Sequence, residues 1–149
     1  MSHLTLFRRE LQWGNKVLWS YDESQDEEIY QAYCIVRDAG VTVFDTADSY
    51  GTFDLNGRAE ILLGQFETRY QAEKKETSPW WNFETTESVQ QQRQQVATKL
   101  APYPWRLTRG SVLQAAKDSL KRLQQPKLTI AQLHWSTSNY LPQQEPVLW

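Results

Sequence analysis

Apolar residues recur along the chain at two different spacings. In residues 29–36, 59–70 and 112–123 they fall three and four positions apart, as on one face of an amphipathic helix. Short, nearly continuous apolar runs lie at 41–44, 96–100 and 128–133, which is the length of a buried strand. The pattern therefore predicts strands that alternate with helices.

Local signals give these elements their limits. Residues 24–27 have the spacing of a capping box and Gly40 favours a helix end, so a first helix is expected between them. A second helix is expected after Asn56-Gly57, and Thr108 is a suitable N-cap for a third. Residues 4–19 surround the turn-forming pair Gly14-Asn15, and we interpret them as one or two short strands.

A polar stretch at about 71–95 interrupts the alternation. It is rich in Gln and Glu and is longer than most loops of α/β units, so we expect a surface insertion there. The remaining order is strand, helix, strand, helix, strand, helix, strand. Such an order is typical of the α/β class, with about four parallel strands joined by right-handed helical crossovers in one domain, residues 1–149.

Composition narrows the possible partners. The 149 residues carry a net charge of −2 and no concentrated basic patch, so neither nucleic acid nor a membrane surface is an expected partner. Cys34 is the only cysteine and no signal-peptide pattern or long apolar segment is present, which favours a reducing, cytoplasmic location.

Ionisable side chains stand where the predicted strands end. Asp45, Lys99 and His134 each follow or close a different strand, and Tyr50 lies in the loop that begins at Asp45. Because the carboxyl ends of parallel strands share one rim, we expect these four side chains to meet there. Each has a structural explanation when taken singly, but four at one rim favour a catalytic site.

These residue types suit proton transfer to an oxygen. A free tyrosine has a pKa near ~10 and becomes useful in acid–base chemistry when a nearby cation favours its phenolate. We expect Lys99 to be that cation, Asp45 to hold Lys99, and His134 to orient an incoming carbonyl. No nucleophile motif or metal-ligand spacing accompanies them, and a nicotinamide hydride is one candidate for the missing reactant.

Three segments carry a resemblance to a known family. Phe-Asp-Thr-Ala-Asp-Ser-Tyr-Gly at 44–51, Ala-Thr-Lys-Leu at 97–100 and Gln-Leu-His-Trp at 132–135 resemble, in order, signature segments of aldo-keto reductases. The resemblance implies a (β/α)₈ barrel of the TIM type, NADPH as hydride donor and a small carbonyl compound as substrate. It also implies a catalytic tetrad of Asp45, Tyr50, Lys99 and His134, with Asp45 close to the cofactor as well. No metal is implied.

The chain is short for such a barrel, which needs about 250 residues. We therefore expect the N-terminal half of an aldo-keto reductase, which as an isolated chain is inactive or self-associates through its open sheet edges. The alternative is a non-catalytic half-barrel that serves as a binding or regulatory module. Trp19, Trp105 and Trp135 are candidate pocket residues, with core or rim packing as the alternative, and the substrate stays open.

Overall fold

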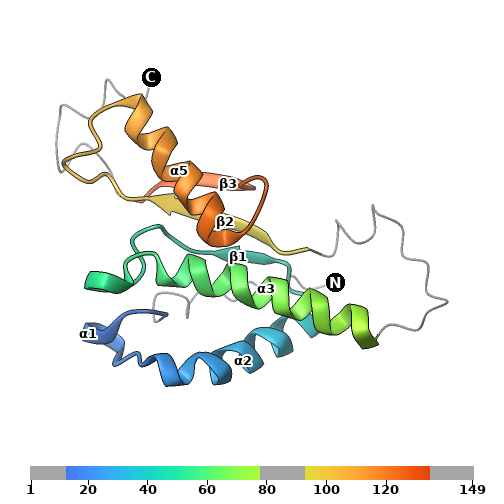
Figure 1. The fold of residues 1–149 in the computed structure, drawn as a ribbon. Helices are drawn as coiled ribbons and strands as arrows, with labels where there is room; N and C mark the ends of the chain where they lie inside the picture. Colours follow the sequence, from blue (N-terminus) through green and yellow to red (C-terminus); the bar gives the residue numbers. More distant parts are fainter. Residues whose placement is uncertain (1–12, 78–92, 135–149) are drawn as a thin grey trace.

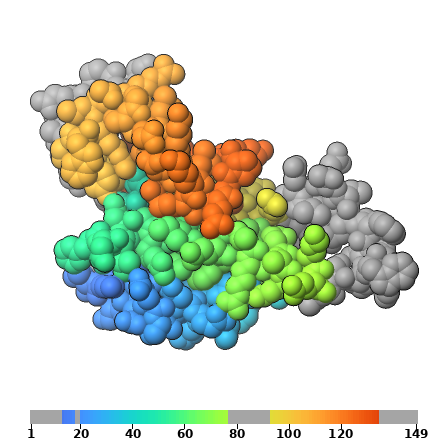
Figure 2. Space-filling model, viewed as in Figure 1, coloured from blue at the N-terminus to red at the C-terminus, as the bar shows by residue number. Residues whose placement is uncertain are grey.

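The computed structural model describes residues 13–77 and 93–134 of the chain. Figure 1 shows helices α2, α3 and α5 in a row along one side of a small sheet. Contacts between neighbouring elements place α3 between α2 and α5. The space-filling view shows the same succession from blue through green to orange (Figure 2).

The helices are α1 (Lys16–Trp19), α2 (Asp26–Asp38), α3 (Arg58–Thr77) and α5 (Arg109–Leu123), with 3₁₀ turns η2 (Glu23–Gln25) and η3 (Phe53–Leu55).

Three parallel strands make up the described sheet, in the order β1 (Val43–Asp45), β2 (Gln95–Leu100) and β3 (Ile130–Leu133). Helix α3 lies between β1 and β2 in the sequence, and α5 lies between β2 and β3. The predicted strands at 41–45, 96–100 and 128–133 are thus confirmed, although the first and third begin two residues later than expected, and so is the α/β class with helical crossovers.

The prediction of strand structure at 4–19 is wrong where the structure describes it, because Lys16–Trp19 forms helix α1. Gly14 has a φ of +84°, so an extended strand cannot continue through this residue. The Lys16 amide then donates to Thr52 Oγ1 at 3.0 Å, so the first turn finds its acceptor on a distant loop. Residues 4–12 lie outside the described part, and the prediction of a strand there is not tested.

Helix α2 forms as predicted, but the capping box lies two residues earlier than expected, on the 3₁₀ turn η2 that leads into the helix. The capping box is made by Asp22, which accepts from the Ser24 amide at 2.9 Å, and by Gln25, which accepts from the Asp22 amide at 3.1 Å. Tyr33 of the predicted stripe is buried, together with Tyr30 and Arg37, whereas Ile29 and Val36 of that stripe are only partly buried. The tyrosines are preferred because their rings fill the core while their hydroxyls reach partners on α3.

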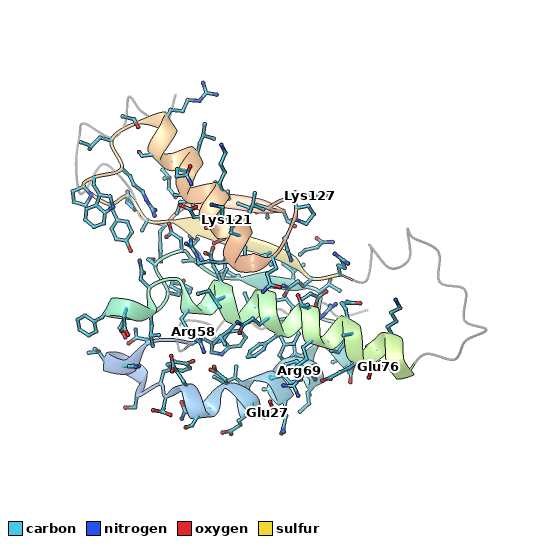
Figure 3. The ribbon with its side chains drawn as sticks, in the orientation of Figure 1. Glu27, Arg58, Arg69, Glu76, Lys121 and Lys127 are labelled. Carbon is cyan, nitrogen blue, oxygen red and sulfur yellow. The ribbon has the colours of Figure 1, made fainter. Side chains whose placement is uncertain are left out.

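Helix α3 continues to Thr77, which corrects the start of the expected insertion. Gln71–Glu76 is polar, yet Gln, Ala, Glu and Lys are strong helix formers, so the helix persists after its apolar face has ended. Residues 78–92 lie outside the described part, and a surface insertion there stays a prediction. On the exposed side of this helix, Arg69 pairs with Glu27 of α2 at 2.6 Å (Figure 3).

Helix α5 begins at the predicted cap. Thr108 Oγ1 accepts from the Ser111 amide at 3.1 Å, and Gln124 adopts a left-handed conformation with φ of +53° at the other end. Arg122 reaches across to the buried Glu60 of α3 at 2.7 Å, and Thr98 of β2 donates to the same carboxylate at 2.5 Å. One carboxylate therefore joins both helices to the central strand.

The core between helices and sheet is largely aromatic. Tyr33 packs at 5.1 Å from Phe44 of β1 and 5.7 Å from Phe66 of α3, between ring centroids. The buried members of this cluster are Tyr21, Tyr30, Tyr33, Phe44, Leu62, Leu63, Phe66, Val96 and Leu123. It fills the space between the helices and the sheet, so the strands are held in fixed register.

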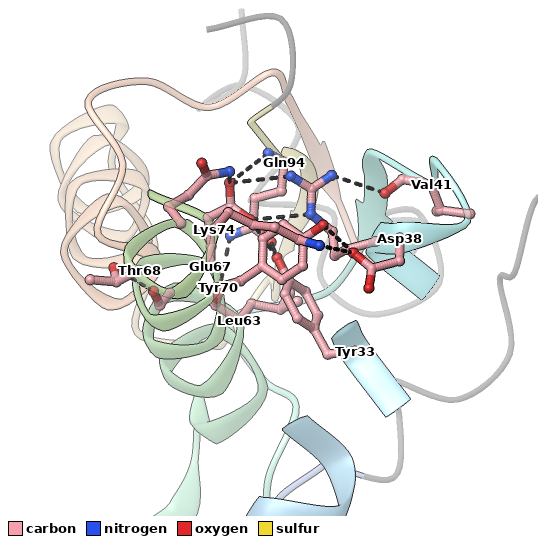
Figure 4. Close-up of polar contacts among 12 residues, drawn as sticks. Tyr33, Asp38, Val41, Leu63, Glu67, Thr68, Tyr70, Lys74 and Gln94 are labelled. Atoms are coloured by element: carbon pink, nitrogen blue, oxygen red, sulfur yellow. Dashed lines mark hydrogen bonds and ion pairs between the residues drawn. The ribbon is translucent and has the colours of Figure 1, made fainter. Parts of the chain in front are cut away.

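A buried carboxylate organises the end of the core opposite the strand C-termini. Glu67 accepts from the Tyr33 hydroxyl at 2.6 Å and from the Gln94 amide at 3.1 Å, and it pairs with Arg37 at 3.3 Å (Figure 4). Arg37 also donates to the Val41 carbonyl at 3.0 Å. A buried charge with this many partners is compensated, and it ties α2 and α3 to the start of β2.

The free energy of unfolding should fall at alkaline pH because two buried tyrosines, Tyr21 and Tyr33, have raised pKa values. Burial, with the hydrogen bond to Asp26 second, raises the pKa of Tyr21 to about 12, and burial beside Glu67 raises the pKa of Tyr33. Unfolded tyrosines ionise near pH ~10, so above that pH the unfolded state binds fewer protons than the folded state. We expect the free energy of unfolding to decrease from about pH 10 to about pH 12. It should be insensitive to these groups at lower pH.

Urea unfolding of the wild type and of Tyr21→Phe across this range measures the effect. The variant should lose stability less steeply above about pH 10, since one proton-linked group is gone. Equal slopes for the two proteins would contradict the role of Tyr21.

Candidate active site

The carboxyl ends of the three strands lie at one edge of the sheet. Asp45 closes β1 and pairs in register with Ala97, two positions before Lys99 on β2. Lys99 is opposite Gln132 of β3, and His134 follows the last residue of that strand. The three predicted positions are thus neighbours on successive strands.

Lys99 is at the centre of the site. Its ammonium group donates to the Asp45 carboxylate, to the Thr46 carbonyl at 3.0 Å and to the Tyr50 hydroxyl at 3.5 Å. These three contacts account for the three protons that an ammonium carries. The Lys99 and Asp45 side chains are 17% and 22% exposed, so the ion pair is partly shielded yet reachable from the rim.

His134 completes the group from the third strand. Its ring meets the Tyr50 ring edge-on, with centroids 5.4 Å apart and planes at 73°. The His134 amide donates to the Leu100 carbonyl at 3.1 Å, which fixes the backbone at this point. The structure therefore brings together all four side chains that the sequence placed at the rim, Asp45, Tyr50, Lys99 and His134.

The loop that carries Tyr50 is shaped by a glycine. Gly51 has a φ of +131°, and a Cβ atom at this position would lie 1.8 Å from the Leu55 carbonyl oxygen. The Tyr50 amide donates to the Ala47 carbonyl at 3.2 Å, and the Thr52 amide donates to Gly14 at 3.0 Å. The chain therefore makes a tight turn here, and the Tyr50 hydroxyl points back to Lys99.

A second ion pair at the rim was missed by the sequence interpretation. The Asp48 side chain is fully buried, pairs with Arg106, and accepts from the Ala101 amide at 3.0 Å. Arg106 also donates to the Ala101 carbonyl at 2.7 Å. The pair fastens the tyrosine loop to the residues that follow Lys99. The available signal was Asp48 itself, a carboxylate beside apolar Ala47 that needs a cation once buried.

Within residues 13–77 and 93–134, no three His, Cys, Asp or Glu side chains are grouped as a metal site. No helix in those same ranges is long and apolar enough to cross a bilayer.

The three candidate pocket tryptophans differ in what the structure describes. Trp105 is 70% exposed and its ring stacks on Tyr103, with centroids 4.6 Å apart. Trp135 lies outside the described residues, and so does the side chain of Trp19.

Chemically, the group can deliver a proton to an oxygen at the rim. The Tyr50 hydroxyl lies 3.5 Å from Lys99 Nζ and the His134 ring lies beside the Tyr50 ring, so both side chains can contact the same oxygen. Asp45 uses one oxygen for Lys99, and no hydrogen bond to its other oxygen is observed within the described residues. That oxygen can accept a further hydrogen bond, for example from a hydroxyl group.

Comparisons with known proteins agree on one family. The model of the aldo/keto reductase family matches residues 11–144. The chloroplastic pyridoxal reductase of Arabidopsis thaliana is 47% identical over 137 residues, which are 92% of this chain and 34% of that protein. This chain thus spans about a third of the length of that curated relative. The relative is chloroplastic, so a cytoplasmic location stays a prediction.

Solved structures show the same fold. A thermostable aldo-keto reductase with the inhibitor epalrestat is 24% identical, with a TM-score of 0.56 over 86% of this chain and 38% of that one. An aldo/keto reductase from Klebsiella pneumoniae, crystallised with NADP and acetate, is 25% identical, with a TM-score of 0.51 over 76% of this chain and 31% of that one. The described strands and helices are accordingly part of a TIM-type barrel.

Proposed function

Since this chain belongs to the aldo/keto reductase family, we propose that it carries the catalytic half of an NADPH-dependent carbonyl reductase. The observation that supports the proposal most directly is Lys99, which contacts both the Asp45 carboxylate and the Tyr50 hydroxyl. We propose an aromatic aldehyde such as pyridoxal as substrate, because the Arabidopsis relative is a pyridoxal reductase.

Each residue has a distinct part in this reaction. NADPH, when bound, supplies the hydride that reduces the carbonyl carbon. Tyr50 gives the proton that the carbonyl oxygen needs to become a hydroxyl, and Lys99 stabilises the phenolate that is left. His134 directs the oxygen to Tyr50, and Asp45 both fixes Lys99 and offers its second oxygen to a hydroxyl of the cofactor ribose.

The test needs a complete barrel. We suggest a chimera in which residues 1–149 replace the matching segment of the Arabidopsis relative, with NADPH oxidation measured in the presence of pyridoxal. Turnover would support the proposal. A chimera that is monodisperse and binds NADPH but reduces no aldehyde would contradict it and would favour a non-catalytic binding module.

Lys99→Met in the chimera should slow reduction at neutral pH by at least about tenfold and move the pH of half-maximal rate upward. The cation that favours the phenolate over the neutral phenol is then gone. The matched control is Lys121→Met, since Lys121 is exposed on α5 (Figure 3) and pairs only loosely with Asp118 at 3.3 Å. Coincident pH–rate profiles for Lys99→Met and wild type would show that Lys99 does not tune the site.

A further inference from the structure

A carboxylate is buried where helices α3 and α5 meet the central strand. Glu60 of α3 is fully buried, and both of the glycines nearest to it in the sequence lie against Arg122 of α5. A Cβ atom on Gly57 would lie 2.9 Å from the Arg122 side chain, and one on Gly64 would lie 2.5 Å from the Arg122 carbonyl oxygen. The absence of side chains at these two positions therefore lets α5 come close enough for Arg122 to reach Glu60.

Both oxygens of the Glu60 carboxylate accept hydrogen bonds. Oε1 accepts from the Thr98 hydroxyl at 2.5 Å, and Oε2 accepts from Arg122 Nε at 2.7 Å. Arg122 donates from Nη2 to the hydroxyl of the fully buried Ser119 at 3.2 Å, so its guanidinium is held as well. A buried carboxylate whose donors are all in place is a rigid point of attachment, because a shifted donor would leave it unsatisfied.

The bond from Thr98 connects this attachment point to the strand of Lys99. The two residues are neighbours in β2, and neighbouring side chains of a strand point to opposite faces, so Thr98 faces the helices and Lys99 does not. The Lys99 amide donates to the Thr46 carbonyl at 3.2 Å, and its carbonyl accepts from the Asp48 amide at 2.9 Å. These backbone bonds hold β2 within the sheet, and the Thr98 hydroxyl holds it against the helices.

The position of β2 matters because one contact of Lys99 is long. Its Nζ atom lies 3.5 Å from the Tyr50 hydroxyl but 3.0 Å from the Thr46 carbonyl. A distance of 3.5 Å exceeds the usual range of an N–H···O hydrogen bond, so a small displacement of the strand breaks this contact first. The attraction between an ammonium group and a phenolate also weakens as they separate.

We infer that Thr98 is a positioning residue, which ties β2 to the buried Glu60–Arg122 pair and thereby keeps the Lys99 ammonium beside the Tyr50 hydroxyl. Thr98 faces the helices and acts on the rim through Lys99. The inference rests on the proposed function for its effect on catalysis. The placement of Lys99 beside Tyr50 is tested in the 149-residue chain without any turnover.

Thr98→Val is the test variant, because valine has the shape of threonine without the hydroxyl and is favoured in strands. A substitution of Glu60 is less suitable, since it would leave the charge of Arg122 uncompensated and destabilise the helix pair. Thr98→Ser is the conservative variant, since it keeps a hydroxyl that can donate to Glu60.

The ionisation of Tyr50 reports where the ammonium group lies. Tyr50 faces Lys99 of β2 and His134 after β3, and Asp45 of β1 pairs with Lys99. In protein labelled with ¹³C at tyrosine Cζ, the Tyr50 NMR signal is identified as the one that Tyr50→Phe removes. We expect the pH at which Tyr50 is half ionised to rise by about 0.5 to 1 unit in Thr98→Val, because a more distant cation stabilises the phenolate less. It should stay at the wild-type value in Thr98→Ser.

Thr68→Val is the matched control. The Thr68 hydroxyl also joins α3 to the end of α5, since it donates to Gln124 Oε1 at 2.9 Å, but Thr68 is exposed and makes no contact of this kind with the sheet. This variant should leave the ionisation of Tyr50 unchanged. If Thr98→Val left it unchanged too, or if Thr68→Val moved it equally, the positioning role of Thr98 would be overturned.

Kinetics in the chimera measure the effect on the reaction. Thr98→Val should lower kcat for pyridoxal at neutral pH by about 3- to 10-fold and move the pH–rate profile upward by about 0.5 to 1 unit. KM for pyridoxal and Kd for NADPH should stay within about twofold of wild type. In a Lys99→Met background, Thr98→Val should not move the profile further, since no ammonium group is left to be positioned. A further displacement in that background would contradict an action through Lys99.

The two measurements separate this inference from the proposed function. Turnover in the chimera with a pH–rate profile that Thr98→Val leaves in place would reject the positioning role alone. A Tyr50 ionisation that responds to Thr98→Val, in a chimera that reduces no aldehyde, would reject the proposed function alone.

Discussion

Tyr50→Phe in the chimera should lower kcat for aldehyde reduction by roughly 10²- to 10⁴-fold, the range that a well-placed acid contributes. Only the hydroxyl that lies 3.5 Å from Lys99 Nζ is removed. The ring, its edge-on contact with His134 and the glycine turn at Gly51 are retained. We therefore expect the Kd for NADPH to change by less than about twofold, since the loss concerns a group that acts in the transition state.

Steady-state kinetics and fluorescence titration with NADPH measure the two quantities separately. A suitable control is Tyr70→Phe, which removes a hydroxyl that donates to Asp38 on the helical side and should leave kcat close to wild type. If Tyr50→Phe kept most of its kcat, the proton would have another source and the assigned tetrad would be wrong. A collapse of NADPH affinity would instead place Tyr50 in the cofactor site.

The elements and the rim could be predicted because their signals are local. A helix such as α5 is specified by its own cap at Thr108 and by apolar spacing within fifteen residues. Only one further rule was needed to place Asp45, Lys99 and His134 together. Parallel strands end at a common edge of the sheet. Their contacts with Tyr50 follow from the turn at Gly51.

What could not be predicted depends on pairing between distant polar residues. Asp48 and Arg106 are 58 positions apart, and neither lies in a periodic pattern. Glu60 with Arg122 and Glu67 with Arg37 are likewise distant in the sequence, and in both pairs a buried carboxylate joins separate helices. The Lys16 amide at the start of helix α1 likewise donates to Thr52, which is 36 positions away. Apolar spacing indicates which face of a helix or strand is buried. It does not indicate which charged side chains pair with one another.

The end of α3 is a different case, because the signal was present in the sequence. Gln71–Glu76 combines strong helix formers with high polarity, and the polarity suggested a loop. The structure shows that propensity prevails here, since the helix needs no apolar face where it is exposed to solvent.

Arg106→Met should destabilise the 149-residue chain by about 3–5 kcal/mol, as expected when one partner of a buried ion pair is removed. The Asp48 side chain is fully buried and its Arg106 partner is only 17% exposed, so solvent cannot replace the guanidinium without opening the rim. Methionine keeps much of the side-chain volume, and the loss therefore reports charge and hydrogen bonds more than packing. Urea unfolding followed by circular dichroism measures the change.

Arg69→Met is the matched control, because the same substitution then removes exposed ion pairs with Glu27 and Glu73, whose side chains are 58% and 50% exposed. Exposed pairs of this kind contribute at most about 1 kcal/mol. Adding Asp48→Asn to Arg106→Met should restore part of the stability, since a neutral amide oxygen can still accept from the Ala101 amide without carrying an uncompensated charge. If Arg106→Met cost no more than Arg69→Met, or if Asp48→Asn deepened the loss, the buried pair would not be what fastens the tyrosine loop to the end of β2.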